Sequence, residues 1–178
     1  MERYIIWIVS NLFFVLFAIA VCTTIVKVRR QSVALLSPRG AYVAWGELLF
    51  YAIGIWFVYT GILHAYFQEF VAPTIGWQPS PFEYELGWME IPLAVVAMMS
   101  LWRGYEFRLA TTIVVVTFTL AAAAQHIQQI VCCANNAGSN AGPILWFADI
   151  FIPLLLVVLA AWSSRDRTER ATSSRENR

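Results

Sequence analysis

Long runs of apolar residues alternate along the chain with short polar stretches. A helix that crosses a bilayer needs roughly 20 consecutive, mostly apolar residues. Five stretches meet this requirement, and the predicted spans cover residues 4–26, 42–67, 81–102, 107–131 and 143–162. The pattern therefore predicts an all-α fold, a polytopic membrane bundle of five transmembrane helices in one domain over residues 1–162. We expect the last four helices to form the core and the N-terminal helix to pack outside it.

The first apolar stretch has an alternative interpretation as a secretory signal or signal anchor. Ala18–Ala20 resembles a cleavage site, but the residues before the stretch carry almost no positive bias. Lys27, Arg29 and Arg30 follow it, and positive charge at that position opposes translocation. We therefore interpret the stretch as a retained span.

Lysine and arginine are unevenly distributed over the connections between the predicted spans. The first and third connections and the C-terminal tail are basic, whereas residues 68–80 and 132–142 contain no Lys or Arg. Because basic connections stay in the cytoplasm, we expect a multi-pass protein of the cell membrane with its N-terminus outside. The Ser-, Arg- and Glu-rich tail, residues 163–178, is expected to be cytoplasmic and disordered.

The composition agrees with a lipid environment. Hydrophobic residues make up 60% of the chain and charged residues 13%, and the mean hydropathy is +0.64; soluble domains carry about 25% charged residues. The net charge of +1 gives no basic field for a nucleic acid, so we expect the lipid bilayer and no nucleic acid as partner. Three cysteines are too few for a disulfide scaffold.

The third predicted span begins with a helix-start signal. Ser80 precedes Pro81, and Glu83 occupies the third helical position. This order is typical of a capping box, in which the N-cap hydroxyl and the N3 carboxylate bind backbone N–H groups reciprocally. We therefore expect Glu83 to cap the helix rather than to belong to a functional site.

Ionisable residues inside the predicted spans are the strongest indication of a site. An acidic side chain near the bilayer centre costs roughly 2.5–3.5 kcal/mol on insertion scales, so it needs a compensating role. Glu47 falls at the inner end of its span, whereas the other five fall in the outer half: His64, Glu85, Glu90, His126 and Asp149. At about 1.5 Å rise per residue, Glu85, His126 and Asp149 should lie at similar depth. We expect these five residues to surround one polar pocket.

Neighbouring residues add to this expectation. Gly54 and Gly61 make a small face beside His64 that would let another helix approach closely. Pro153 frees the carbonyl of Asp149, which is tolerated mainly where the backbone faces protein or a wet cavity. Three amides close to His126 in sequence are expected around it: Gln125, Gln128 and Gln129.

The chemistry of the pocket stays open at this point. A proton, a small ligand or a metal such as Zn, Mn or Fe would suit its residues, with His64, His126, Asp149 and Glu85 as candidate metal ligands. No nucleophile, cofactor motif or reaction can be named, so the sequence leaves enzymatic activity uncertain. The alternative is an accessory subunit, as a homo-oligomer or in a membrane complex, whose polar cluster only holds helices together.

Three motifs are similar to an uncharacterised bacterial membrane family known only as a domain of unknown function. They are Glu85-Leu86-Gly87, His126 on the following helix, and Asp149-Ile150-Phe151 on the last. The resemblance covers roughly residues 43–160 and implies that Glu85, His126 and Asp149 act as a unit. Met89-Glu90 stands where the family has Ala-Asn, and Gln125 replaces a Gly before His126. The helix layout also loosely resembles DoxX-like membrane proteins.

Overall fold

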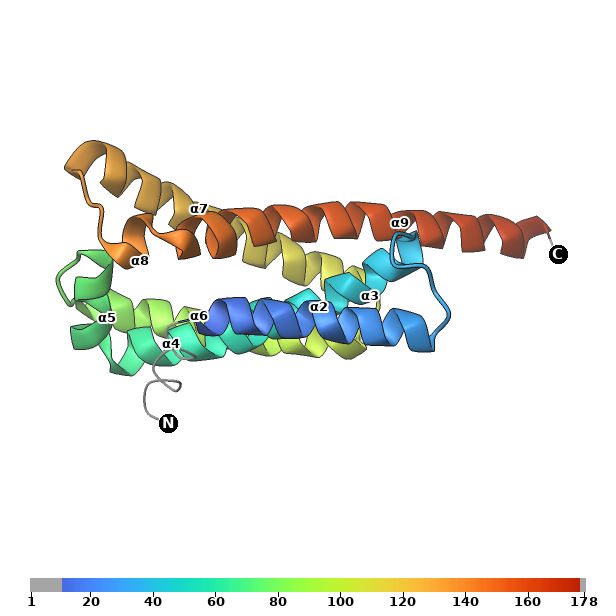
Figure 1. Ribbon diagram of the computed structural model, residues 1–178, viewed down its shortest axis with the longest axis horizontal. Helices are drawn as coiled ribbons and strands as arrows, with labels where there is room; N and C mark the ends of the chain where they lie inside the picture. Colours follow the sequence, from blue (N-terminus) through green and yellow to red (C-terminus); the bar gives the residue numbers. More distant parts are fainter. Residues whose placement is uncertain (1–10, 177–178) are drawn as a thin grey trace.

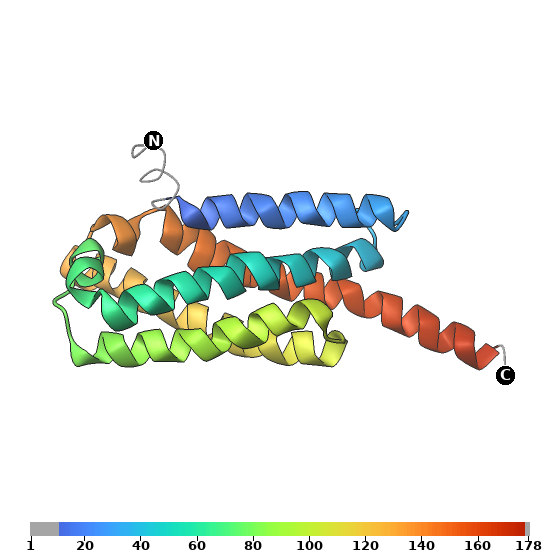
Figure 2. The same ribbon diagram turned by 90° about the horizontal axis from the view of Figure 1, so that it is seen from below.

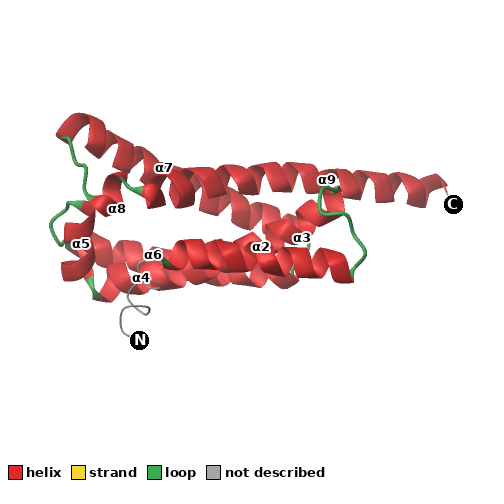
Figure 3. Cartoon of the chain, in the orientation of Figure 1, coloured by secondary structure: helices red, strands yellow, loops and turns green. Residues whose placement is uncertain are grey.

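The computed structural model describes residues 11–176, and the side chains of residues 11–165. Within this range every regular element is helical (Figure 3). The α-helices are α2 (Leu12–Arg30), α3 (Pro38–Leu48), α4 (Trp56–Tyr66), α5 (Gln68–Ile75), α6 (Pro81–Met99), α7 (Tyr105–Cys133), α8 (Gly138–Ala141) and α9 (Ile152–Glu176). Two π-helical turns, η1 (Leu49–Ile55) and η3 (Leu145–Phe151), and a 3₁₀ turn, η2 (Ser100–Trp102), complete the chain.

Five helices are long and apolar enough to cross a membrane, as the sequence predicted. They are Leu12–Arg30, Pro38–Tyr66, Pro81–Trp102, Tyr105–Cys133 and Leu145–Arg165. The second continues from α3 through η1 into α4, and the fifth from η3 into α9. Residues 4–10 of the first predicted span lie outside the described residues. The predicted all-α membrane bundle is thus confirmed.

The helices run along one long axis, with α2 on the outside of the bundle (Figures 1 and 2). One face of α2 is buried, through Phe13, Leu16, Ala20, Thr24 and Val28, a spacing of three or four residues that keeps them on one side. The central core joins residues of α3, η1, α4, α6, α7 and α9, among them Ile53, Leu93, Val115 and Leu156, and α2 adds Phe13 and Ala20 to it. The N-terminal helix therefore packs on the outside of the bundle, against a core formed mainly by the other four spans.

Small residues bring α4 and α6 into close contact. A Cβ placed on Gly61 would lie 3.0 Å from the carbonyl oxygen of Gly87, and one on Gly87 would lie 2.5 Å from that of Gly61. Gly54 faces Met98 and Ala94 of the same helix. The predicted close approach beside His64 is confirmed, with α6 as the partner helix.

The connections differ from the expected loops at two places. Residues 68–75 form α5, whose buried Val71 and Ile75 are four residues apart, and Gly76 ends it with a φ of +79°. At the C-terminus, α9 continues to Glu176, whereas we expected a disordered tail from Ser163. Residues 163–176 contain neither Gly nor Pro, and four of them are Arg, which favours helix.

One buried guanidinium links the helices at the end of the bundle that carries the basic connections. Arg108 is 5% exposed. Its nitrogens donate to the carbonyl oxygens of Ser100 (2.8 Å), Leu101 (3.0 Å) and Tyr42 (2.7 Å). We name the Arg108 guanidinium and its three carbonyl partners the arginine cap. It joins the start of α7 to the end of α6 and to α3.

Other polar groups at this basic end are also paired. Buried Glu47, at the inner end of its span, forms a salt bridge with Lys27. The indole nitrogen of Trp45 donates to the hydroxyl of Thr112 at 2.9 Å. Ser100 and Thr111 lie within hydrogen-bonding distance of each other. The interactions at this end are those of a stable helix junction.

Candidate functional site

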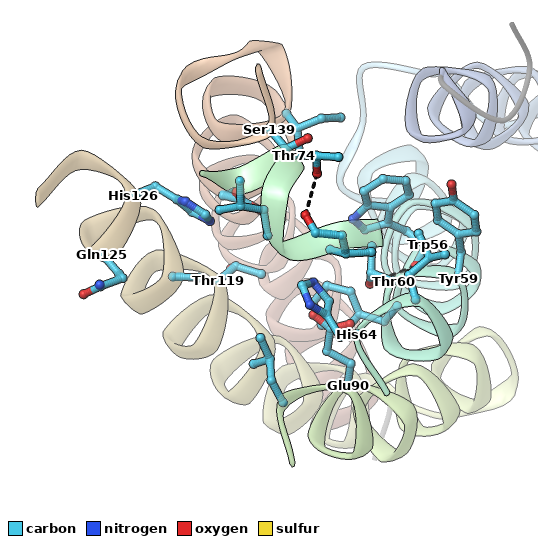
Figure 4. A pocket seen from close by; sticks show the side chains of 18 of the residues that line it. Trp56, Tyr59, Thr60, His64, Thr74, Glu90, Thr119, Gln125, His126 and Ser139 are labelled. Carbon is cyan, nitrogen blue, oxygen red and sulfur yellow. Dashed lines mark hydrogen bonds between the residues drawn. The ribbon is translucent and has the colours of Figure 1, made fainter. Parts of the chain in front are cut away.

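A cavity of about 420 Å³ lies at the opposite end of the bundle, between α4, α5, α6, α7 and η3 (Figure 4). Figure 1 shows α7 diverging from α6 toward this end, where α5 and α8 lie. Phe70, Thr74 and Gln125 line the cavity and are exposed, so it opens to the surface. Four of the five predicted site residues line it: His64, Glu90, His126 and Asp149.

The geometry of α6 decides which of its carboxylates face this region. Successive helical residues are rotated by about 100°, so Glu83 and Glu90, seven apart, share a face. Glu85 is rotated by about 140° from Glu90 on the same reckoning. It is exposed and lies in a shallow surface depression with Tyr84, Trp88 and Met89. The structure therefore does not bring Glu85 to His126 and Asp149.

Glu90 is the most deeply buried of the cavity's carboxylates, with 7% of its surface exposed. The hydroxyl of Thr60 on α4 is its hydrogen-bonding neighbour, and Asp149 is close enough for the two carboxyl groups to interact electrostatically. The second carboxyl oxygen, Oε2, is buried and has no partner among the described residues. An unpaired polar atom in such a place costs about 1–3 kcal/mol.

His64 lies at the end of α4, on the helix face that also carries Phe57 and Thr60. Its Nδ1 is 3.5 Å from Oε2 of Glu83, a long contact that crosses from α4 to α6. Figure 4 shows His64 and Glu90 entering the same space from these two neighbouring helices. The Gly61–Gly87 contact holds the two helices together at this level.

Glu83 does not act as the predicted capping carboxylate. Ser80 is the N-cap of α6, with Pro81 following, but its side chain makes no capping hydrogen bond. Glu83 is 1% exposed, and its Oε1 has no partner among the described residues. Burial beside His64 and a face shared with Glu90 outweigh the local capping signal. The helix start was predicted correctly, and the role of Glu83 was wrong.

His126 is held from the last turns of α7 by an asparagine of α8. Its Nδ1 lies 2.8 Å from Oδ1 of Asn140, a fully buried residue whose Nδ2 donates to the carbonyl oxygen of Asn135 at 2.8 Å. Because an amide oxygen only accepts, Nδ1 of His126 is the donor and Nε2 is left free of this interaction. The ring stacks on Trp77, with centroids 5.7 Å apart and planes inclined by 14°.

The glutamines expected around His126 are not its partners. Gln128 is exposed, and the carbonyl of Gln129 accepts from the backbone of Asn135 beyond the helix end. Gln125 lines the cavity mouth, but its side chain points away from the other labelled residues in Figure 4. Asn140, fourteen residues further along the chain, takes the expected role.

Asp149 belongs to the π-helical turn η3, directly before α9. It is half-buried and lines the cavity. The widened turn ends just before Pro153, which cannot donate a backbone hydrogen bond. Such π-turns often accompany functional sites.

A metal does not fit the described residues. Among residues 11–176, no three His, Cys, Asp or Glu side chains form a group that could hold a metal ion. Glu85, one of the four candidate metal ligands, lies outside the cavity. The arrangement is instead an amphipathic cavity with two carboxyl groups and two imidazoles.

Several lining residues were not identified from the sequence. Thr60 and the aromatic side chains Trp56, Tyr59 and Trp77 resemble ordinary span or interface residues, and only their placement at the cavity distinguishes them. The α5 residues had a usable signal, because Val71 and Ile75 are spaced for one helix face and Gly76 follows as a helix end. Asn140 had none.

Comparisons with known proteins identify a family and no function. Residues 10–169 match a family described as a "Family of unknown function (DUF6790)". No curated protein and no solved structure matches the chain. The match extends over nearly the whole chain and agrees with the expected resemblance to a family of unknown function. The chain belongs to the DUF6790 family.

Proposed function

We propose that this integral membrane protein binds a small amphipathic molecule in the cavity between α4, α5, α6, α7 and η3. Cavities of about 300–1,000 Å³ with an apolar lining and a few polar groups are typical of small-molecule sites, and this one measures about 420 Å³. The basic connections lie at the other end of the bundle. By the charge rule, the cavity therefore faces the outer half of the cell membrane.

The unpaired Oε2 of Glu90 carries this proposal. A buried carboxyl oxygen without a partner is costly, and its cost is recovered when a bound molecule supplies a hydrogen-bond donor. Asp149, Nε2 of His126 and Thr60 lie around the same space. Trp56, Phe57 and Phe118 offer an apolar surface for the remainder of the molecule.

The alternative function, an accessory subunit, predicts a different pattern of hydrogen bonds among these residues. A polar cluster that only holds helices together should consist of groups that satisfy one another across the interface. Here the helix contact is made by Gly61 and Gly87, while the carboxyl groups of Glu83 and Glu90 each keep one oxygen unpaired. These observations favour ligand binding over helix association as the role of the cluster.

Filling the cavity tests the proposal. Ala122 lines the cavity, whereas Ala124, two residues along the same helix, is exposed. We expect small molecules co-purified with the wild-type protein and Ala124→Phe, identified by mass spectrometry, to be displaced in Ala122→Phe. Equal retention of the same species by both variants would contradict the proposal.

A further inference from the structure

We propose that the molecule bound in this cavity is an organic cation, with an ammonium group at Glu90 and Asp149 and an apolar body against the aromatic residues. This inference rests on the proposed ligand binding and names the chemical class of the ligand.

Among the described residues, the ionisable groups of the lining are the carboxyls of Glu90 and Asp149, two imidazoles and the phenol of Tyr59, and none of them is a Lys or Arg. The described basic residues, such as Lys27 and Arg108, are at the opposite end of the helices, and Arg108 is fully engaged by backbone carbonyls. An anion would therefore meet two carboxyl groups without any guanidinium or ammonium to bind it.

A cation would supply what the two carboxyl groups lack. Glu90 is buried with Oε2 unpaired, and the carboxyl group of Asp149 lines the same cavity and interacts with it electrostatically. Buried charges are stable when they are paired and hydrogen-bonded. An ammonium group is a donor only, with up to three N–H bonds to give. It therefore matches two acceptors that come from different helices.

The aromatic lining favours the same class. Trp56, Tyr59 and Trp77 line the cavity together with Phe57, Phe70 and Phe118. Ring faces attract cations through their quadrupole, and the attraction grows when the site excludes water. The same rings bury an apolar body through the hydrophobic effect. Carboxylates for the charge and rings for the body together specify an amphipathic amine.

The test compares three probes of nearly equal shape: benzylamine as its ammonium ion, benzyl alcohol and benzoate. Their binding to the full-length protein in detergent is measured by isothermal titration calorimetry. We expect benzylammonium to bind about tenfold or more tightly than benzyl alcohol, and benzoate not to bind measurably. This comparison needs no variant, so its result does not depend on whether a mutant folds.

Three variants then locate the preference. Glu90→Gln and Asp149→Asn should each reduce the preference for the ammonium while retaining benzyl alcohol, and the surface control Glu85→Gln should behave like the wild-type protein. Benzyl alcohol or benzoate binding as tightly as benzylammonium would overturn the inference but leave the proposed ligand binding standing. Failure of all three probes to bind would overturn both.

Discussion

The two ends of the bundle differ in whether their buried polar groups are paired. At the basic end, the arginine cap pairs Arg108 with three carbonyl oxygens, and Glu47 is paired with Lys27. At the cavity end, Glu83 and Glu90 each keep a buried oxygen without a partner. The same helices form both ends, so the difference lies in whether the buried polar side chains find partners within the protein. One end is built for stability, and the other leaves polar atoms free for something else.

The largest expected effect comes from breaking the arginine cap. Arg108→Ala should lower the free energy of unfolding by about 3 kcal/mol or more, because three hydrogen bonds to a charged group are lost in a buried place. Unfolding by sodium dodecyl sulfate in mixed micelles measures the change. Arg103→Ala, at an exposed position in the same connection, should change it by less than about 0.5 kcal/mol. Similar losses of unfolding free energy in both variants would contradict a special stabilising role of Arg108.

Separating α4 from α6 should have the next largest effect. In Gly87→Ala the new Cβ would lie 2.5 Å from backbone atoms of Gly61 and Ala65, so the helices must move apart. We expect a loss of about 1–3 kcal/mol in the same unfolding experiment, together with weaker probe binding. A Cβ on Gly138 meets nothing within 4 Å. Gly138→Ala should therefore be neutral or stabilising, and a comparable loss there would count against the close-packing argument.

Cation binding should weaken as the pH falls from about 8 to about 5, by about tenfold. Protons compete with the cation for the carboxyl oxygens of Glu90 and Asp149, so the affinity should fall with the pH. Calorimetric titrations with benzylammonium, which stays charged over this range, measure the change. An affinity that is constant or rises at low pH would contradict ionised carboxylates as the binding groups.

The smallest effects on the free energy of unfolding are expected at the N-cap serines of two Ser-Pro helix starts, which lie at opposite ends of the bundle. The Ser37 hydroxyl accepts a hydrogen bond from the backbone N–H of Gly40 at 3.0 Å, whereas the Ser80 side chain makes no capping bond. Ser37→Ala should cost about 1 kcal/mol, and Ser80→Ala less than about 0.5 kcal/mol, in the unfolding experiment. A reversed order would restore the capping box at Ser80.

The fold was largely predictable from the sequence because apolar length alone identifies helices that cross a bilayer. The structure confirms the five spans, and the end positions differ by only a few residues where a signal such as Ser80-Pro81 was present. The four-residue helix α8 was missed because so short a stretch carries no periodicity. Helix α5 was missed although the spacing of Val71 and Ile75 and the following Gly76 were a usable signal. The extension of α9 was missed because composition does not distinguish a polar helix from a disordered tail.

The candidate site was only partly predictable. Depth arguments placed His64, Glu90, His126 and Asp149 in the outer half of the membrane, and they line one cavity. Depth contains no information on direction around a helix, which is why Glu85 was included. Glu83 was left out because its position after Ser80-Pro81 is typical of a capping box. Applying the rotation of about 100° per residue would have grouped Glu83 with Glu90. The pairing of His126 with Asn140 depends on how α8 folds back, which no local pattern encodes.

Cysteine modification tests most directly whether this end of the bundle holds a water-accessible cavity that prefers cations. Ala122→Cys, in a chain whose Cys22, Cys132 and Cys133 are changed to Ser, is treated with a trimethylammonium or a sulfonate methanethiosulfonate reagent, and each rate is divided by that of a free thiol. We expect the cationic reagent to be favoured by about tenfold. Adding Glu90→Gln and Asp149→Asn should reduce this ratio toward one. Equal normalised rates in the starting variant, or no reaction with either reagent, would contradict a cation-binding cavity.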